Sequence, residues 1–316
     1  MRLVSVGLRS IQALLKLKFG VGNRLRYAKQ PASTDGITEP MILIRFMAVG
    51  LLTCALARQS LADMFTIEFQ TGFLYAVSSE DASLTFVGDT ELSLPGGLAY
   101  HDSDLFSFTA GDSPELYRID PQTGTSTFVA NIDVPQFSEG ALTFSPEGKI
   151  YAAYTGFGGN PSLVTYDLHT GVTGTVGPIS SAPHDINGLV WRDDGMLLGL
   201  DRITNSLLTI DPHTAVASEL AKLEPAVGGA GGMTMANNGQ GYLATGSDQS
   251  NAPGTNSLYS FNPYSGDISF VGEFDLNLTD LGLSGLAYVP EPAASYYLAV
   301  ALSFLVLRLR DCSYAA

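Results

Sequence analysis

The stretch "GGLAYHDSDLFSFTAGDSPELYRIDPQTGTSTFVANID", residues 96–133, contains four short apolar or alternating runs separated by turn residues. Three further stretches align with it, and they begin at Gly140, Asn187 and Gly231. Each contains the same four runs, which are typical of short strands joined by tight turns. A repeat of about 40 to 50 residues with four strands is the blade of a β-propeller, in which neighbouring blades bury one another's faces around an axis. The sequence therefore predicts an all-β propeller.

The turns between the runs have two recurring forms. The first turn reads "SPEG", "RDDG" or "ANNG", in which Gly or Asn supplies the positive φ of a tight hairpin. The last turn reads "IDPQTG", "YDLHTG", "IDPHTA" or "FNPYSG", in which an Asp or Asn side chain can cap the backbone N–H groups that follow it. We therefore expect a turn-capping role, and no metal binding, for Asp120, Asp167, Asp211 and Asn262.

The two ends of the repeat region complete one further blade. The segment "MFTIEFQTGFLYAVSSEDASLTFVGD" from Met64 supplies the last three runs of a blade without the first, and "SGLAYV" from Ser284 supplies a first run with nothing after it. Pairing of these ends would close the ring and remove its free edges. The sequence thus predicts five blades. Six blades, with one hidden, and an open β-sandwich are the alternatives.

The charge of the chain excludes some partners. Residues 63–290 hold 27 acidic residues against five basic ones, a formal charge of −22 within a chain of net charge −15. A surface of this sign repels nucleic acid and anionic membranes, so nucleic-acid binding is excluded. Both cysteines, Cys54 and Cys312, lie outside this window, which leaves it without a disulfide or a thiol nucleophile.

The segment before the repeats has the layout of a secretory signal peptide. From Met41 it reads "MILIRFMAVGLLTCALARQSLADMF", with a basic residue, an apolar run, and small residues at the positions before a cleavage site between Ala62 and Asp63. We therefore expect residues 41–62 to be removed on export. Residues 1–40 are then an upstream extension from a start codon placed too early, with Met41 as the true start.

The segment after the repeats has the layout of a second targeting signal. Pro290, Glu291 and Pro292 precede an apolar run over residues 293–307, and Arg308 and Arg310 follow it. A helix over this run would span roughly 22 Å, which is short for a permanent anchor in a bilayer core of about 30 Å.

This arrangement resembles the PEP-CTERM sorting signal of exopolysaccharide-producing Gram-negative bacteria, and the "LYRIDPQTG" core resembles the LYxIDPxTG repeats of exported bacterial propeller proteins. The resemblance implies that residues 291–316 contact the membrane through a short helix and are processed by an exosortase-type membrane protease. The propeller of residues 63–290 would then pass from a membrane-anchored precursor to the cell surface or the extracellular matrix, where a surface component or polysaccharide is its expected partner.

Signatures of common enzymes are absent: the chain has no HExxH, GxxxxGK[ST] or GxSxG motif. In a propeller, the loops that join successive blades and those that join second to third strands emerge on one face near the axis. That face should gather Glu139, His184, Asp185, Asn187, Asp201 and Asp248. Oxygen ligands that converge from several blades can bind Ca²⁺.

Two segments, "EGALTFSPEGKIY" and "NGLVWRDDGMLLGLD", resemble propellers of the gluconolactonase type. The resemblance implies Glu139 and Asn187 as ligands of a divalent metal, and Asp201 as a ligand or as the general base that activates water against a lactone. That family normally has six blades and takes its Glu and Asn from well-separated ones, whereas here they lie in consecutive repeats. We therefore favour a non-enzymatic binding or structural protein without a cofactor, with a metal-dependent lactonase-like hydrolase as the alternative.

Large side chains near the ends of the first strands are expected to pack between blades. They are Tyr100, Phe144, Trp191 and Tyr288.

Overall fold

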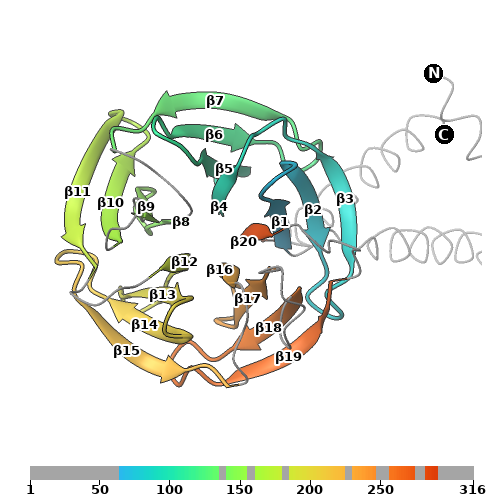
Figure 1. Ribbon diagram of the computed structural model, residues 1–316, viewed down its shortest axis with the longest axis vertical. Coiled ribbons are helices and arrows are strands. Elements are labelled where there is room, and N and C mark those ends of the chain that lie inside the picture. Colours follow the sequence, from blue (N-terminus) through green and yellow to red (C-terminus); the bar gives the residue numbers. More distant parts are fainter. Residues whose placement is uncertain are drawn as a thin grey trace, which may run out of the picture. The chain divides into compact units, whose positions relative to one another are not determined.

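The computed structural model describes residues 64–134, 140–154, 161–179, 185–224, 230–246, 256–274 and 282–290. Within these ranges, 20 strands form five four-stranded antiparallel sheets. The sheets are arranged as blades around a central axis, which confirms the predicted five-bladed propeller (Figure 1). None of the residues in these ranges belongs to a helix long and apolar enough to cross a membrane.

Within each blade, the four strands follow one another from the axis outward. Blade 1 consists of β20 (Leu283–Tyr288), β1 (Met64–Glu68), β2 (Phe73–Val77) and β3 (Leu84–Asp89). Blade 2 consists of β4 (Pro95–His101), β5 (Asp104–Thr109), β6 (Glu115–Ile119) and β7 (Ser126–Asn131). Blade 3 consists of β8 (Gly140–Phe144), β9 (Ile150–Tyr154), β10 (Ser162–Asp167) and β11 (Val172–Pro178). Blade 4 consists of β12 (Ile186–Trp191), β13 (Leu197–Asp201), β14 (Ser206–Ile210) and β15 (Ala217–Lys222). Blade 5 consists of β16 (Ala230–Met235), β17 (Gly241–Thr245), β18 (Ser257–Phe261) and β19 (Ile268–Glu273).

The ring is closed by its two ends, as predicted. β20 pairs antiparallel with β1, with Met64 opposite Tyr288 and Thr66 opposite Leu286. The Thr66 hydroxyl donates a buried hydrogen bond of 2.6 Å to the carbonyl of Gly285 in the same pair of strands. Blade 1 therefore takes its innermost strand from the C-terminal end of the repeat region and its other three from the N-terminal end.

Glycine allows inner strands of neighbouring blades to approach one another closely around the axis. A Cβ atom on Gly188 would lie 2.7 Å from the Cβ of Met233 on the next blade, and one on Gly285 would lie 2.5 Å from the backbone nitrogen of Leu98. Gly232 occupies the same place in blade 5 and has a φ of +149°, a conformation that L side chains rarely adopt. The second residue of the inner-strand motif is thus required to be glycine in blades 1, 4 and 5 by backbone packing at the axis, whereas blade 3 has Ala141 at this position.

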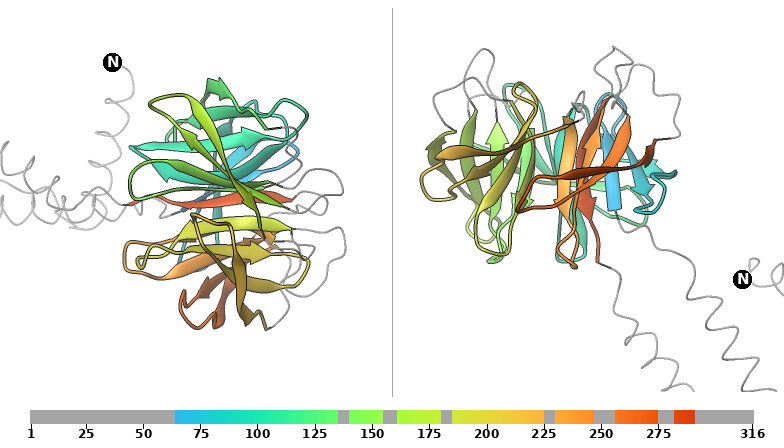
Figure 2. Two further views of the ribbon diagram at one scale, coloured as in Figure 1. Left: turned by 90° about the vertical axis from the view of Figure 1, so that its left-hand side faces the viewer. Right: turned by 90° about the horizontal axis from the view of Figure 1, so that it is seen from below.

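Each blade twists from its inner to its outer strand. Figure 2 shows the outermost strands running obliquely across the direction of the inner ones. The pairing of third and fourth strands shifts register at one equivalent point in every blade, and such bulges increase the local twist. The shifts fall at Leu74/Tyr75, Leu116/Tyr117, Leu163/Val164, Leu207/Leu208 and Leu258/Tyr259.

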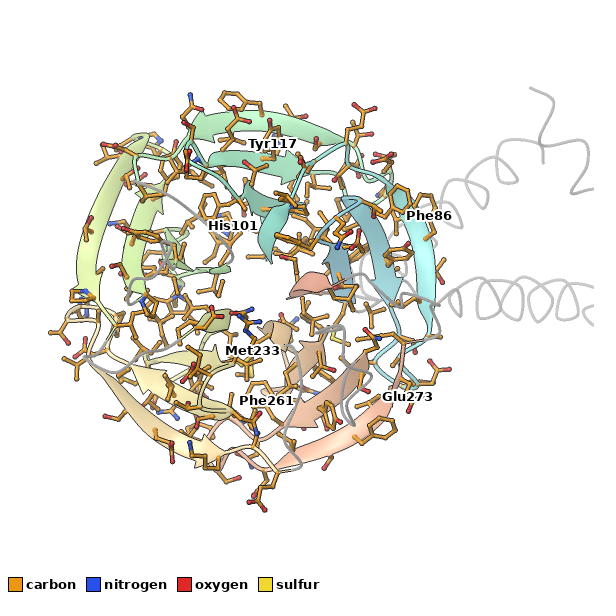
Figure 3. All side chains as sticks on the ribbon, in the orientation of Figure 1. Phe86, His101, Tyr117, Met233, Phe261 and Glu273 are labelled. Atoms are coloured by element: carbon orange, nitrogen blue, oxygen red, sulfur yellow. The ribbon has the colours of Figure 1, made fainter. Side chains whose placement is uncertain are left out.

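The apolar core consists of five clusters, and each cluster joins two adjacent blades. Met233 on β16 and Phe261 on β18, for example, pack with Leu198 and Leu207 of blade 4 (Figure 3). The large residues at the ends of the inner strands all take part in such clusters, which confirms the expectation that they pack between blades. The predicted residues are Tyr100, Phe144, Trp191 and Tyr288, and Met235 occupies the equivalent position in blade 5.

The turns between third and fourth strands are capped as predicted. The Oδ1 of Asp167 accepts hydrogen bonds from the backbone nitrogens of His169 at 2.8 Å and Thr170 at 3.1 Å. Asp120, Asp211 and Asn262 make the same contact with the residue two positions further on. These N–H donors stabilise the charged carboxylate, and they lower the pKa of both Asp167 and Asp211.

Candidate functional site

The structure describes only part of the predicted site. Asp185 precedes β12, Asn187 is the second residue of β12, and Asp201 is the last residue of β13. Glu139, His184 and Asp248 lie outside the described residues. So do the predicted cleavage site at Ala62 and Asp63 and all of the sorting signal except Pro290, namely Glu291, Pro292, Arg308 and Arg310.

Asp201 holds together the turn that follows its own strand. Its side chain is fully buried. One carboxylate oxygen accepts hydrogen bonds from the backbone nitrogens of Asp185 at 2.9 Å and Ile203 at 3.2 Å. The other oxygen accepts a short hydrogen bond from the Thr204 hydroxyl. Both oxygens thus accept hydrogen bonds from donors of the protein itself, and these bonds stabilise the loop.

Glu68 plays the same part in blade 1, although nothing in the sequence pattern had singled it out. It is the last residue of β1 and is fully buried. Its Oε1 accepts a hydrogen bond of 3.0 Å from the nitrogen of Gln70, and its Oε2 accepts short ones from the nitrogen and hydroxyl of Thr71. The signal common to both blades is an acid followed three positions later by Thr, as in "EFQT" and "DRIT".

Asp185 is paired with a cation from the neighbouring loop. Its Oδ2 accepts hydrogen bonds from the Nε and Nη2 of Arg202 at 2.9 and 2.5 Å, and its carbonyl accepts one from the nitrogen of Arg202 at 2.9 Å. The Asp185 side chain is nearly buried, whereas the side chain of Arg202 is 46% exposed. A divalent metal bound to Asp185 would have to compete with this guanidinium group.

Asn187 and Glu139 occupy different positions in the repeat. Asn187 is the second residue of the inner strand, where the other blades have Gly96, Gly140, Gly231 and Ser284. Glu139 precedes Gly140 and therefore corresponds to Ile186, one residue earlier. At the Asn187 position of blade 1, the Ser284 hydroxyl donates to the carbonyl of Pro95 on the adjacent inner strand. Polar side chains at this position can thus serve to join neighbouring blades.

Histidine, cysteine and acidic side chains do not gather into a metal-binding group of three or more anywhere in the described ranges. The carboxylates that the structure describes near the axis are instead engaged by N–H, O–H or guanidinium donors.

The opposite face of the ring carries contacts between neighbouring blades. Arg192 in blade 4 donates to both oxygens of Asp194 and to the carbonyl of Pro263 in blade 5, and its guanidinium carbon lies 4.8 Å above the centre of the Tyr264 ring. The hydrogen bonds from Arg192 lower the pKa of Asp194. The Tyr264 hydroxyl donates to Asp193, which raises the pKa of the tyrosine.

A similar contact joins blades 2 and 3 on this face. The imidazole of His101 stacks on Phe144, with ring centres 4.4 Å apart and planes inclined by 12°. The ring of His101 also lies close to Asp102, with 3.4 Å between Nε2 and Oδ2. The His101–Phe144 stack thus connects blades 2 and 3.

Comparison with known proteins supplies no family. No protein-family model matches the chain. No curated protein matches it either. A chain of the solved structure "Crystal structure of Nidogen/Laminin Complex" is 13% identical with a TM-score of 0.47, over 71% of this chain and 97% of that one. The assignment of the fold therefore rests on the strand order and pairing of this protein itself.

Proposed function

We propose that this protein is a non-enzymatic binding or structural propeller that is exported and held at the cell surface or in the extracellular matrix. The observation that carries the first half of the proposal is the environment of Asp201, the residue expected to act as base in a hydrolase. Its carboxylate is buried and accepts hydrogen bonds from its own loop and from the nitrogen of Asp185. Glu68 likewise accepts hydrogen bonds from its own loop, in a blade for which no catalytic role was expected. A carboxylate that recurs as a turn cap is explained by folding alone.

The positions of the signal peptide and the sorting tail along the chain support export. The signal peptide ends at Ala62, before β1 begins at Met64, and the sorting tail of residues 291–316 begins after β20 ends at Tyr288. Both the signal peptide and the sorting tail can therefore be removed without the loss of any strand of the ring. This is the arrangement that processing by a signal peptidase and an exosortase-type membrane protease requires.

Metal content and melting of the fragment 63–290 test the first half of the proposal. The fragment contains all 20 described strands, so it should fold as a closed ring. We expect it to bind no stoichiometric metal and to melt at the same temperature with Ca²⁺ or with a chelator. A bound metal whose stabilising effect disappears in Glu139→Gln and Asn187→Ala would support the lactonase-like hydrolase instead.

A control is needed because Asp201→Asn lowers the melting temperature whether or not a metal binds. Glu68→Gln provides it, since Glu68 caps the equivalent turn of another blade. If the two variants lose stability equally and both ignore Ca²⁺, Asp201 is a turn cap. A Ca²⁺ response lost in Asp201→Asn alone would contradict that conclusion.

Mass spectrometry of the protein recovered from its native cells tests export. The mature chain is expected to begin at Asp63 and to lack the residues that follow the Pro-Glu-Pro sequence. Recovery of an intact chain that begins at Met1 from the cytoplasm would exclude the proposed sorting.

A further inference from the structure

The outermost strands of three neighbouring blades each expose a phenylalanine. Phe270 in blade 5 is 58% exposed, Phe86 in blade 1 is 55% exposed, and Phe128 in blade 2 is 50% exposed. Each ring stands edge-on against a tyrosine directly opposite it on the third strand, with ring centres 5.6 to 5.8 Å apart. Figure 3 shows Phe86 and Tyr117 near the outer circumference of the ring.

The blade itself does not require these phenylalanines. The equivalent position is Thr175 in blade 3, opposite Val164, and Glu219 in blade 4, opposite Leu208. Both of those blades form the same four strands with the same register shift. The phenyl rings are therefore confined to the contiguous blades 5, 1 and 2, which we call the aromatic rim.

Packing between blades accounts for the small residue that lies two positions after each phenylalanine, but not for the phenylalanine itself. The three strands read "TFVG", "TFVA" and "SFVG", and the small residue at the end abuts a turn of the next blade. A Cβ atom on Gly88 would lie 2.1 Å from the carbonyl oxygen of Thr123, and one on Gly272 would lie 2.4 Å from that of Asp81. The small residue is thus needed to assemble the ring, whereas half or more of each phenylalanine is exposed to solvent. The exposed phenylalanines of the described residues are all on these three blades, whereas the large exposed apolar side chains of blades 3 and 4 are aliphatic.

The aromatic rim is also the most acidic part of the ring. The described residues of blades 5, 1 and 2 include 13 Asp and Glu residues against one cation, Arg118, which lies 3.7 Å from Asp104. The other four cations of residues 63–290 all belong to blades 3 and 4: Lys149, Arg192, Arg202 and Lys222. Exposed carboxylates flank Phe86 along the chain at Glu80, Asp81, Asp89 and Glu91.

We propose that the aromatic rim binds an extended basic segment of a partner protein, with Lys or Arg side chains above the exposed phenyl rings. The proposal rests on the binding role proposed above and names the partner's chemistry. A cation over an aromatic face is attracted by the negative charge of the ring, and the surrounding carboxylates add long-range attraction. β3, β7 and β19 are the last strands in their sheets, so an extended segment can also pair with an outer edge. A partner of negative charge is repelled by the same surface.

Binding of a short peptide that alternates arginine and threonine to fragment 63–290, measured by calorimetry, tests the proposal. The variant is Phe86→Thr, Phe128→Thr and Phe270→Thr combined, because threonine is the natural residue at the equivalent position of blade 3. The control is Val172→Thr, which replaces a side chain that is 61% exposed on the outermost strand of blade 3. We expect the triple variant to bind the peptide at least about tenfold more weakly and the control to bind it unchanged.

The charge component is tested separately with Glu80→Gln and Glu91→Gln combined, which leaves the aromatic rings in place. Affinity for the peptide should fall in this variant and should also fall between about 0.05 and 0.5 M NaCl. This variant keeps the proposal testable if the triple variant does not fold, which circular dichroism will show.

Three results would overturn the proposal. One is no binding of the arginine peptide by the wild-type fragment. Another is equal binding of the wild-type fragment and the triple variant, which would indicate general attraction to an acidic protein. The third is evidence of a different occupant of the rim, given either by equal binding of a peptide with glutamate in place of arginine or by self-association that the triple variant abolishes. Metal independence of the fragment is measured in a separate experiment, so failure here leaves the non-enzymatic assignment intact.

Discussion

Met64 lies directly opposite Tyr288 in the antiparallel pair of β1 and β20, so the chain enters and leaves the ring at adjacent positions. The pair also has an energetic consequence, because β20 contributes to the clusters on both of its sides. Leu283 and Leu286 belong to the cluster between blades 5 and 1, and Ala287 belongs to the cluster between blades 1 and 2. Loss of one strand therefore opens two of the five interfaces between blades.

A fragment that ends after β20 should accordingly fold, whereas a fragment that ends before β20 should not. Fragment 63–290 is expected to unfold in one cooperative transition, whereas fragment 63–282 should lose that transition and bind a hydrophobic dye. Within the intact ring, Leu286→Ala is expected to cost about 2–5 kcal/mol, because the leucine is 1% exposed. Urea unfolding measures the cost, with the exposed change Val172→Ala as control. Cooperative unfolding of fragment 63–282 at an unchanged midpoint would show that β20 does not close the ring.

The buried turn carboxylates should contribute similar stability in two blades. Asp201→Asn and Glu68→Gln each weaken hydrogen bonds between a buried charged acceptor and its loop, so we expect each to cost about 1–3 kcal/mol. Thermal unfolding at pH 7 measures both variants. If Asp201→Asn leaves stability unchanged while Glu68→Gln lowers it, Asp201 is held in place for a purpose other than its turn.

The repeat, the capped turns and the blade number were predictable because each depends on residues close together in sequence or on complementary fragments. Asp167 and Asn262 indicate their turns because the N–H groups that they cap directly follow them in sequence. The role of Asp201 could not be predicted in this way, because it depends on where β13 ends and on the approach of Asp185. The aromatic rim depends on which blades are neighbours in the ring, and that order includes the contact of blade 5 with blade 1 through β20.

Acid should destabilise the protein partly through the capped turns. The pKa values of Asp167 and Asp211 are lowered in the folded state, chiefly by hydrogen bonds from backbone N–H groups. A lowered folded pKa gives stability that is present above the unfolded pKa, near 3.8, and is lost as the pH falls through the folded pKa. The melting temperature should therefore fall less steeply below about pH 4 in Asp167→Asn and Asp211→Asn than in the wild type.

Blade 5 supplies the reverse test of this pH dependence. Asn262 already caps the equivalent turn without a titrating group, through hydrogen bonds to its Oδ1 from the nitrogens of Tyr264 and Ser265. The Asn262→Asp variant should therefore gain acid sensitivity in the same pH range. If the melting temperatures of all three variants and the wild type change in parallel across that pH range, the capped turns do not contribute to the acid sensitivity.

The inner strands provide a matched pair of substitutions that tests how closely the blades meet at the axis. A Cβ atom on Gly232 would lie 2.4 Å from the backbone nitrogen of Leu286, and the positive φ of Gly232 adds strain to any side chain. We therefore expect Gly232→Ala to cost about 1–3 kcal/mol, measured by urea unfolding. Blade 3 has Ala141 at the equivalent position, so a methyl group is accommodated there. Ala141→Gly should cost only about 0.5–1 kcal/mol through the added freedom of the unfolded chain. If Gly232→Ala proves as mild as Ala141→Gly, the backbones at the axis can separate by the width of a methyl group, and glycine is not what sets the spacing of the blades.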